Sequence, residues 1–262
     1  SVIFINSIEK NLANVTFENI QQVTTRSGDT IAGIVGYNYG NINRVNFKNI
    51  KINAPNVSYV GCIARNYGTE LMNLQLLEVE ISGNSQTGGL IGITEDGTLT
   101  NVILEDITVK GNSNVGGMIG LVQNILNSVN CRHSKISGSN ITVIGKTSCG
   151  GLYGVGGAIK STVSNVNIQG ENNIGGFVGT SSFKLQEVSI DQANIKGTVQ
   201  TIGGIVGNGN HDIEYSYVTN SRIEGLLPTT LYVGGFVGSN SASINHSGIY
   251  HSNIINSGNY TG

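Results

Sequence analysis

Two carboxylates, Glu78 and Asp106, are the side chains best placed for catalysis. They precede equivalent apolar residues, Val79 and Ile107, in successive copies of a repeated pattern. Carboxylates one repeat apart could act as general acid and general base in cleaving a polysaccharide. However, the same position holds Asn in most other copies, and Asn is favoured where a chain bends. A bend explains both residues, so the sequence predicts no catalytic residue and no enzyme.

Histidine and aspartate give no pattern typical of a metal or nucleophile site. No HExxH or GxSxG motif occurs, and His211 and Asp212 would point to opposite faces of a strand. Calcium-binding repeats need more aspartates than the five present. We therefore predict no metal and no cofactor. The histidines are scattered along the chain at His133, His211, His246 and His251.

Three cysteines, Cys62, Cys131 and Cys149, cannot all pair within one chain, and no CxxC spacing suggests a metal. Cys149 occupies an apolar position of the repeat, and Cys131 falls in a column held elsewhere by residues such as Phe17. The pattern favours small buried hydrophobic residues over a disulfide or a reactive thiol.

Tyrosines are the candidate ligand-binding residues. Rings that lie beside Asn-rich loops could bind a sugar, because an apolar ring with polar neighbours suits a pyranose face. Scattered surface tyrosines are the alternative interpretation. The candidates form an N-terminal group, Tyr37, Tyr39 and Tyr67, and a C-terminal group, Tyr215, Tyr217, Tyr232 and Tyr250.

Charge and hydropathy exclude two classes of partner. The 262 residues carry 14 basic and 16 acidic side chains, a net charge of −2, and only 11% of residues are charged. No basic cluster suited to nucleic acid is present. No apolar run reaches the length of a membrane span.

A six-residue box, apolar-Gly-Gly-apolar-apolar-Gly, organises the whole sequence. Its successive intervals are 29, 27, 28, 34, 25, 28 and 31 residues, so a unit is about 29 residues long. A ninth copy would be cut short near Thr261. The eight boxes begin at Ile31, Val60, Thr87, Val115, Cys149, Ile174, Ile202 and Val233.

Ahead of each box, apolar residues alternate as in a strand with one buried face, and then the alternation slips by one residue. Leu74 and Leu76 are thus followed by Val79 and Ile81. A slip of this kind requires a bend, which we place just before the second pair. The predicted bend residues are Asn19, Asn49, Glu78, Asp106, Lys135, Asn194, Arg222 and Asn253.

The Gly-Gly pair of each box predicts a second corner, through positive φ or a close backbone approach that excludes Cβ. The two following apolar residues would begin a third side, and the closing Gly, such as Gly92, would give the next turn. The predicted corner glycines are Gly88, Gly89, Gly116, Gly117, Gly150, Gly151, Gly175, Gly176, Gly203, Gly204, Gly234 and Gly235.

Three short strands per unit predict a single all-β domain over 1–262, a parallel β-solenoid (β-helix) of roughly 8–9 coils. Helical repeats share this period, but 38 glycines and two-residue alternation oppose helix. Equivalent positions in adjacent coils also predict exposed ion pairs between Lys51 and Glu80 and between Lys196 and Glu224.

The box resembles the GLUG motif, named for Gly-Leu-hydrophobic-Gly, and Gly89-Leu90-Ile91-Gly92 matches it literally. The second box departs from it, with Cys62 for Gly and Arg65 for the closing Gly. GLUG repeats occur in large microbial surface and secreted proteins, including adhesin-like proteins and non-catalytic parts of IgA-cleaving metalloproteases. The resemblance implies an extracellular or cell-surface location, although no signal peptide is visible.

Three functions remain open at this point. The first is a non-enzymatic rod, stalk or filament of an adhesin-like protein, which stacks end to end or on adjoining repeats. The second is a module whose Tyr- and Asn-rich loops bind a glycan or a host or surface protein. The third is a β-helix enzyme that processes polysaccharide.

Overall fold

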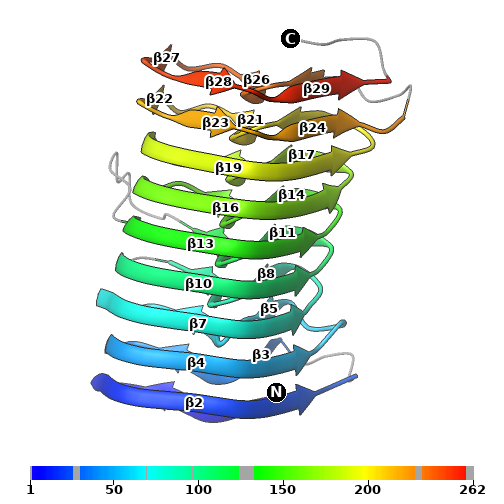
Figure 1. Cartoon of the computed structure of the whole chain (residues 1–262). Coiled ribbons are helices and arrows are strands. Elements are labelled where there is room, and N and C mark those ends of the chain that lie inside the picture. The colour runs from blue at the N-terminus through cyan, green and yellow to red at the C-terminus, as the bar shows by residue number, and fades with distance from the viewer. Residues whose placement is uncertain are drawn as a thin grey trace.

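The computed structural model describes residues 2–25, 30–68, 70–95, 97–123, 133–227 and 232–257. They form a parallel β-solenoid in which each coil lies directly on the one before it (Figure 1). All regular structure within these ranges is strand. The predicted all-β solenoid is therefore confirmed.

One wall of the solenoid is a 13-stranded parallel sheet built from the alternating segment of each repeat. In the last two coils this segment is divided into three short strands. The long strands are β2 (Asn11–Val23), β4 (Asn41–Asn53), β7 (Glu70–Ser82), β10 (Thr98–Lys110), β13 (His133–Ile144), β16 (Ile159–Gly170) and β19 (Leu185–Gly197). The divided ones are β22 (Ile213–Glu214), β23 (Tyr217–Thr219) and β24 (Arg222–Gly225), then β27 (Ile244–Asn245), β28 (Gly248–Tyr250) and β29 (Asn253–Asn256).

Two stacks of short strands flank the glycine corner of each coil and belong to a 16-stranded sheet. The strands before the corner are β5 (Tyr59–Val60), β8 (Gln86–Gly88), β11 (Ser113–Gly116), β14 (Thr147–Gly150), β17 (Asn172–Gly175), β20 (Thr201–Gly203) and β25 (Tyr232–Gly234). Those after it are β6 (Ile63–Asn66), β9 (Ile91–Thr94), β12 (Ile119–Val122), β15 (Tyr153–Gly156), β18 (Val178–Ser181), β21 (Val206–Gly209) and β26 (Val237–Asn240).

The first coil differs because strand β3 (Ile31–Asn38) continues through the corner. It pairs with β1 (Val2–Ile8) on one side and with both β5 and β6 on the other, and so joins the two short stacks into one sheet. In the coils from β7 to β19, one long and two short strands make each coil, and not three short strands as predicted. The two short strands predicted ahead of the box are one continuous strand that bends.

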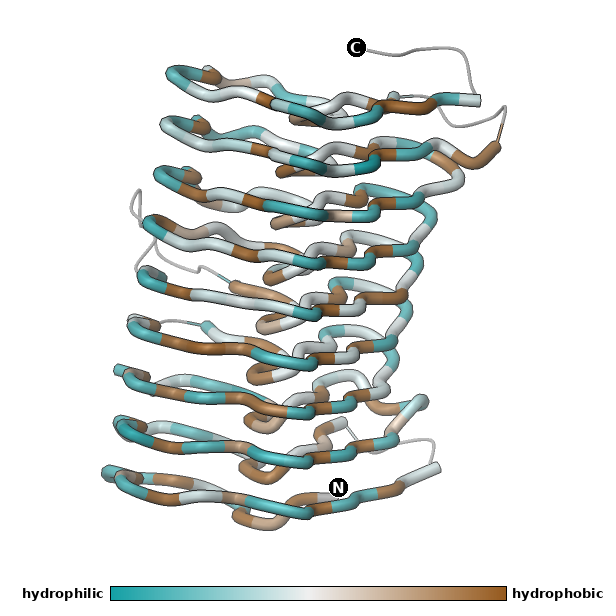
Figure 2. The backbone as a smooth tube through the Cα atoms, in the orientation of Figure 1, coloured by the Kyte–Doolittle hydropathy of each residue, from teal (hydrophilic) through white to brown (hydrophobic). Residues whose placement is uncertain are grey.

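The core is a set of columns of mostly apolar residues that run from coil to coil. Val45, Leu74 and Val102 pair in register on successive long strands, and each is almost fully buried. Figure 2 shows the resulting alternation of hydrophobic and hydrophilic residues along each long strand. Each coil thus buries its apolar face against its neighbours, as solenoid stability requires.

Each long strand bends twice, and at each bend a residue other than glycine adopts the left-handed conformation. The bend residues of the long strands have φ between 49° and 59°. Asn and Asp tolerate this conformation best among residues with a Cβ, because their side chains can hydrogen-bond locally. The predicted bend at Asn19, Asn49, Glu78 and Asp106 is confirmed.

The bend prediction is wrong for three later coils. The left-handed residues there are Gln192, Asn220 and His251, in place of Asn194, Arg222 and Asn253. Small inner residues explain the shift, since Ala193, Ser221 and Ser252 stand in the column that holds Ile107 in an earlier coil. Because these small residues do not stand out as apolar, the pattern predicts the next apolar residue, such as Ile195, as the first inner residue after the bend.

Lys135 does bend, but at the first bend of its strand, not the second. That first bend was not predicted, although the three-residue step from Leu71 to Leu74 is its signal.

Leu104 pairs with Gly138, so the column assigned to Cys131 continues through Gly138. Cys131 itself lies outside the described residues.

The glycine corner is confirmed between β8 and β9 and in the equivalent coils, and close backbone approach is its cause. A Cβ on Gly88 would lie 2.2 Å from the Ile91 carbonyl oxygen, and one on Gly89 would lie 2.3 Å from that of Gly117. Among the described glycines only Gly97 has φ in the left-handed range. The predicted turn at Gly92 is wrong, because Gly92 lies inside β9.

The first two boxes have a shorter corner than the six-residue pattern predicts. Val60 pairs with Thr87 and Ile63 with Ile91, which leaves two residues between them where the third box has three. Ala64 therefore stands at the closing-glycine position, and the assignment of Arg65 to it is wrong. Similarly, Ala32 pairs with Val60, so the first box begins at Ala32 rather than Ile31.

One of the two predicted ion pairs is confirmed. The Lys51 ammonium lies 2.8 Å from the Glu80 carboxylate of the next coil. Lys196 lies beside Glu224 in register, but Glu224 instead pairs with Arg222 of its own strand at 3.0 Å.

We expect Lys51→Glu to change the free energy of unfolding by less than about 1 kcal/mol, because both partners are about half exposed and solvent screens them. Urea denaturation of the variant and the parent protein measures the difference. A loss of several kcal/mol in the same measurement would contradict the exposed placement.

A buried amide ladder crosses the first three coils. Asn38 donates to Asn66 Oδ1 at 2.7 Å, and Asn66 donates to Thr94 Oγ1 at 3.0 Å. The Gly68 amide also donates to Asn66 Oδ1, at 3.3 Å. All three ladder side chains are fully buried. Asn66 therefore satisfies polar groups that water cannot reach.

We expect Asn66→Ala to destabilise the protein by about 2–4 kcal/mol, because it removes three buried hydrogen bonds at once. Asn112→Ala is the matched control. Asn112 donates to Asn84 Oδ1 at 2.6 Å on the exposed surface and has no left-handed φ, so its loss should cost less than about 1 kcal/mol. Equal losses in the two variants, measured by urea denaturation, would contradict the role of burial.

Candidate functional site

The N-terminal tyrosine group forms one stack, as the sequence suggested. Tyr39 lies 5.1 Å from Tyr67 with its ring nearly parallel, and 6.4 Å from Tyr37. The Arg65 guanidinium lies over the rings of Tyr67 and Tyr59, at 5.1 Å and 4.9 Å. The ring faces therefore contact one another or a cation, which leaves less aromatic surface for a sugar.

An ion pair connects this stack to the neighbouring coil. Arg65 forms an ion pair with Glu95 at 3.0 Å. Burial raises the pKa of Tyr67, with Arg65 opposing the rise and Glu95 adding to it. The groups of this cluster thus largely satisfy one another, because the Arg65 guanidinium is shared between two tyrosine rings and the Glu95 carboxylate.

The C-terminal tyrosines do not form one group. Tyr215 stacks on the His246 ring at 4.9 Å, and Tyr217 lies 6.2 Å from Tyr250. Tyr232 lies on β25 in the other sheet. All four tyrosines are partly exposed, from 39% for Tyr217 to 53% for Tyr250. A ligand role for either group stays a prediction.

Glu78 and Asp106 are both left-handed bend residues with φ of 57°. Their neighbours Val79 and Ile107 pair in register, so the two carboxylates stand on adjacent coils as expected. Both side chains are exposed on the solenoid surface, and Asp106 accepts a hydrogen bond from Asn140 at 2.9 Å. Bend geometry accounts for the pair without a catalytic role.

His133 is the one histidine in the described core. It is 3% exposed and stacks against Tyr153 at 5.7 Å. Burial lowers its pKa to about 4. No hydrogen bond joins His211 to Asp212 in the described part of the chain, because His211 Nδ1 is buried without a partner there and Asp212 Oδ1 accepts from the Ser243 amide.

Cys62 and Cys149 are buried free thiols, as predicted. Burial raises the pKa of Cys62, and it raises that of Cys149 to about 12, with Glu171 adding to the rise. Thiols in this state are poor nucleophiles at neutral pH. Their role is to fill the core.

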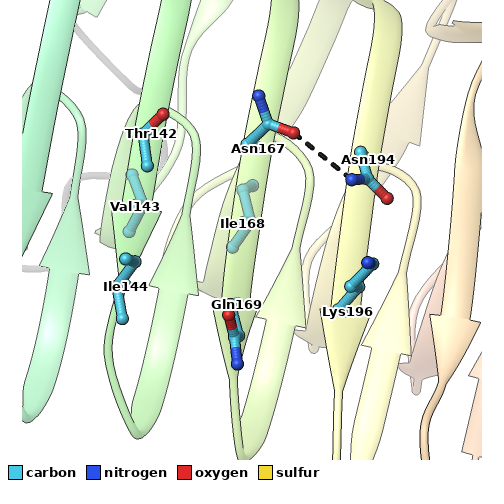
Figure 3. Close-up of a pocket in the computed structure, with 8 residues that line it drawn as sticks. All are labelled: Thr142, Val143, Ile144, Asn167, Ile168, Gln169, Asn194 and Lys196. Carbon is cyan, nitrogen blue, oxygen red and sulfur yellow. Dashed lines mark hydrogen bonds between the residues drawn. The ribbon is translucent and has the colours of Figure 1, made fainter.

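A shallow depression of about 150 Å³ lies on the outer face of β13, β16 and β19 (Figure 3). Sequence reasoning did not find it, because its residues come from three coils and occupy ordinary outward positions. The Asn194 amide donates to Asn167 Oδ1 at 3.3 Å across it. Its outward side chains are Thr142, Ile144, Asn167, Gln169, Asn194 and Lys196.

Two further observations concern the described residues alone. No three His, Cys, Asp or Glu side chains within these ranges gather closely enough to hold a metal ion. The same ranges contain no long apolar helix of the kind that crosses a membrane.

Comparison with family models, curated proteins and solved structures finds no match for this chain.

Proposed function

We propose that this chain is a non-enzymatic structural segment, a rigid rod or stalk of an adhesin-like surface protein. The observation that carries the proposal is the unbroken stacking of coils in register around one shared core. From β2 to β19 every long strand pairs in parallel with the next, and all of them contribute buried residues to one apolar core.

The physical basis of the proposed role is the way such a stack resists bending. Each coil adds about 4.8 Å, so the nine stacked levels of this sheet make a body about 40 Å long. Backbone hydrogen bonds between coils run along this axis, and close glycine contacts leave little room for coils to shift. A body of this kind holds whatever it carries at a set distance.

The extracellular part of the proposal rests on the resemblance to GLUG repeats. Antibody labelling of intact producing cells tests it, with permeabilised cells as the control. We expect labelling of the intact cells. Labelling that requires permeabilisation would overturn the surface location, and turnover in a reducing-sugar assay on acidic and neutral polysaccharides would overturn the non-enzymatic role.

A further inference from the structure

We propose that the depression over β13, β16 and β19 binds one acidic sugar unit, a pyranose ring that carries a carboxylate. This site is independent of the proposed rod function, since a stalk needs no ligand. The inference rests on the side chains that three successive coils place together (Figure 3).

The lining matches the surface of a pyranose. Asn167, Gln169 and Asn194 present amides that can both donate and accept, which suits ring hydroxyls that do the same. Ile144 is 39% exposed at the edge and offers an apolar contact for the C–H groups of the ring. A few convergent polar groups beside an apolar surface are typical of small-molecule sites.

Asn194 supplies a reason for a ligand to bind. Its Oδ1 atom is buried and has no hydrogen-bond partner among the described residues, while its Nδ2 atom donates to Asn167. A buried acceptor left without a donor is unfavourable. Rotation of the Asn194 side chain would exchange its long 3.3 Å hydrogen bond to Asn167 for a bond in which this oxygen accepts from a ligand hydroxyl.

Lys196 selects for a negative charge. Its expected partner, Glu224, is held at both carboxylate oxygens by Arg222, through Nε at 3.1 Å and Nη2 at 3.0 Å. Lys196 therefore forms no ion pair within the described ranges and stands at the edge of the depression. A ligand carboxylate is the group that would complement it.

The size of the depression limits the ligand to one ring-sized unit. Its volume of about 150 Å³ lies below the range of about 300–1,000 Å³ typical of sites for drug-sized molecules. We expect weak binding, with a Kd on the order of 1 mM, which suits repeated contacts along a polymer rather than capture of a free metabolite.

A ¹H–¹⁵N NMR titration with D-glucuronate, D-glucose and acetate tests the proposal. We expect glucuronate to shift the amide signals of 142–144, 167–169 and 194–196, with glucose weaker and acetate weaker still. Lys196→Gln should weaken glucuronate binding at least fivefold and leave glucose binding unchanged. The control is Lys160→Gln, an exposed bend lysine of β16 outside the depression, which should leave all three titrations unchanged.

Three outcomes would overturn the proposal. The first is the absence of shifts at these residues with glucuronate at tens of millimolar. The second is an equal response to acetate, which would indicate a bare anion site. The third is glucuronate binding that Lys196→Gln does not weaken, once circular dichroism has shown that the variant is folded.

Discussion

Gly117→Ala will destabilise the solenoid by more than about 4 kcal/mol or prevent its folding. A Cβ at this position would lie 2.1 Å from the Gly151 carbonyl oxygen and 2.6 Å from Ile141 Cγ2. The oxygen has little room to retreat, because the Gly151 amide donates a hydrogen bond to the Gly176 carbonyl oxygen of the following coil at 3.1 Å. Urea denaturation followed by far-ultraviolet circular dichroism measures the loss.

Gly248→Ala is the matched control for this prediction. The nearest atom to its added Cβ is the Tyr250 hydroxyl oxygen at 3.0 Å, at the end of a flexible and exposed side chain. We therefore expect a change of less than about 1 kcal/mol. If Gly117→Ala were as mild as Gly248→Ala, close backbone approach would not be the reason for the glycine boxes.

Acidification will destabilise the protein through His133. Burial lowers the pKa of this imidazole to about 4 in the folded chain, against 6.5 as the ordinary value. Between these values the unfolded chain binds a proton that the folded chain excludes. The contribution of His133 is therefore complete above pH 6.5 and is lost as the pH falls toward about 4, at about 1.4 kcal/mol per pH unit.

The His133→Phe variant isolates this contribution. Between pH 6.5 and 5, the free energy of unfolding of this variant should fall much less than that of the parent protein. Most carboxylates titrate below this range. His251→Gln is the control, because His251 is exposed and its replacement leaves His133 in place. Parallel pH profiles for His133→Phe and the parent protein would contradict the effect.

The strand pattern could be predicted where inner positions carry large apolar residues. Val15 and Phe17 align with Val45 and Phe47, and the structure pairs them as expected. The prediction was wrong where Ser or Ala replaced such residues, as at Ala193 and Ser221. These are still inner positions, because the Ser221 hydroxyl accepts a hydrogen bond from the Ala193 amide. Hydropathy alone does not identify Ser221 as an inner residue, because a buried hydrogen bond there takes the place of an apolar contact.

The candidate sites could be predicted less well than the strands, because they depend on which side chains the stacking of coils brings together. Stacking of Tyr39 on Tyr67 could be predicted, since both follow their boxes at similar places, but the placing of Arg65 between two rings could not. The depression was not predicted at all. Asn167, Asn194 and Lys196 come from different long strands or alternate positions, and only the stacking register brings them together.

The sequence by itself determined the repeat length, the strand class and the existence of a glycine corner, because these follow from local periodicity and from the lack of a Cβ. Only the tertiary structure decided which inner residue follows each bend, why the glycines are needed and which outward side chains meet. Those features depend on contacts between coils, where atoms about 30 residues apart in the chain come within a few ångströms.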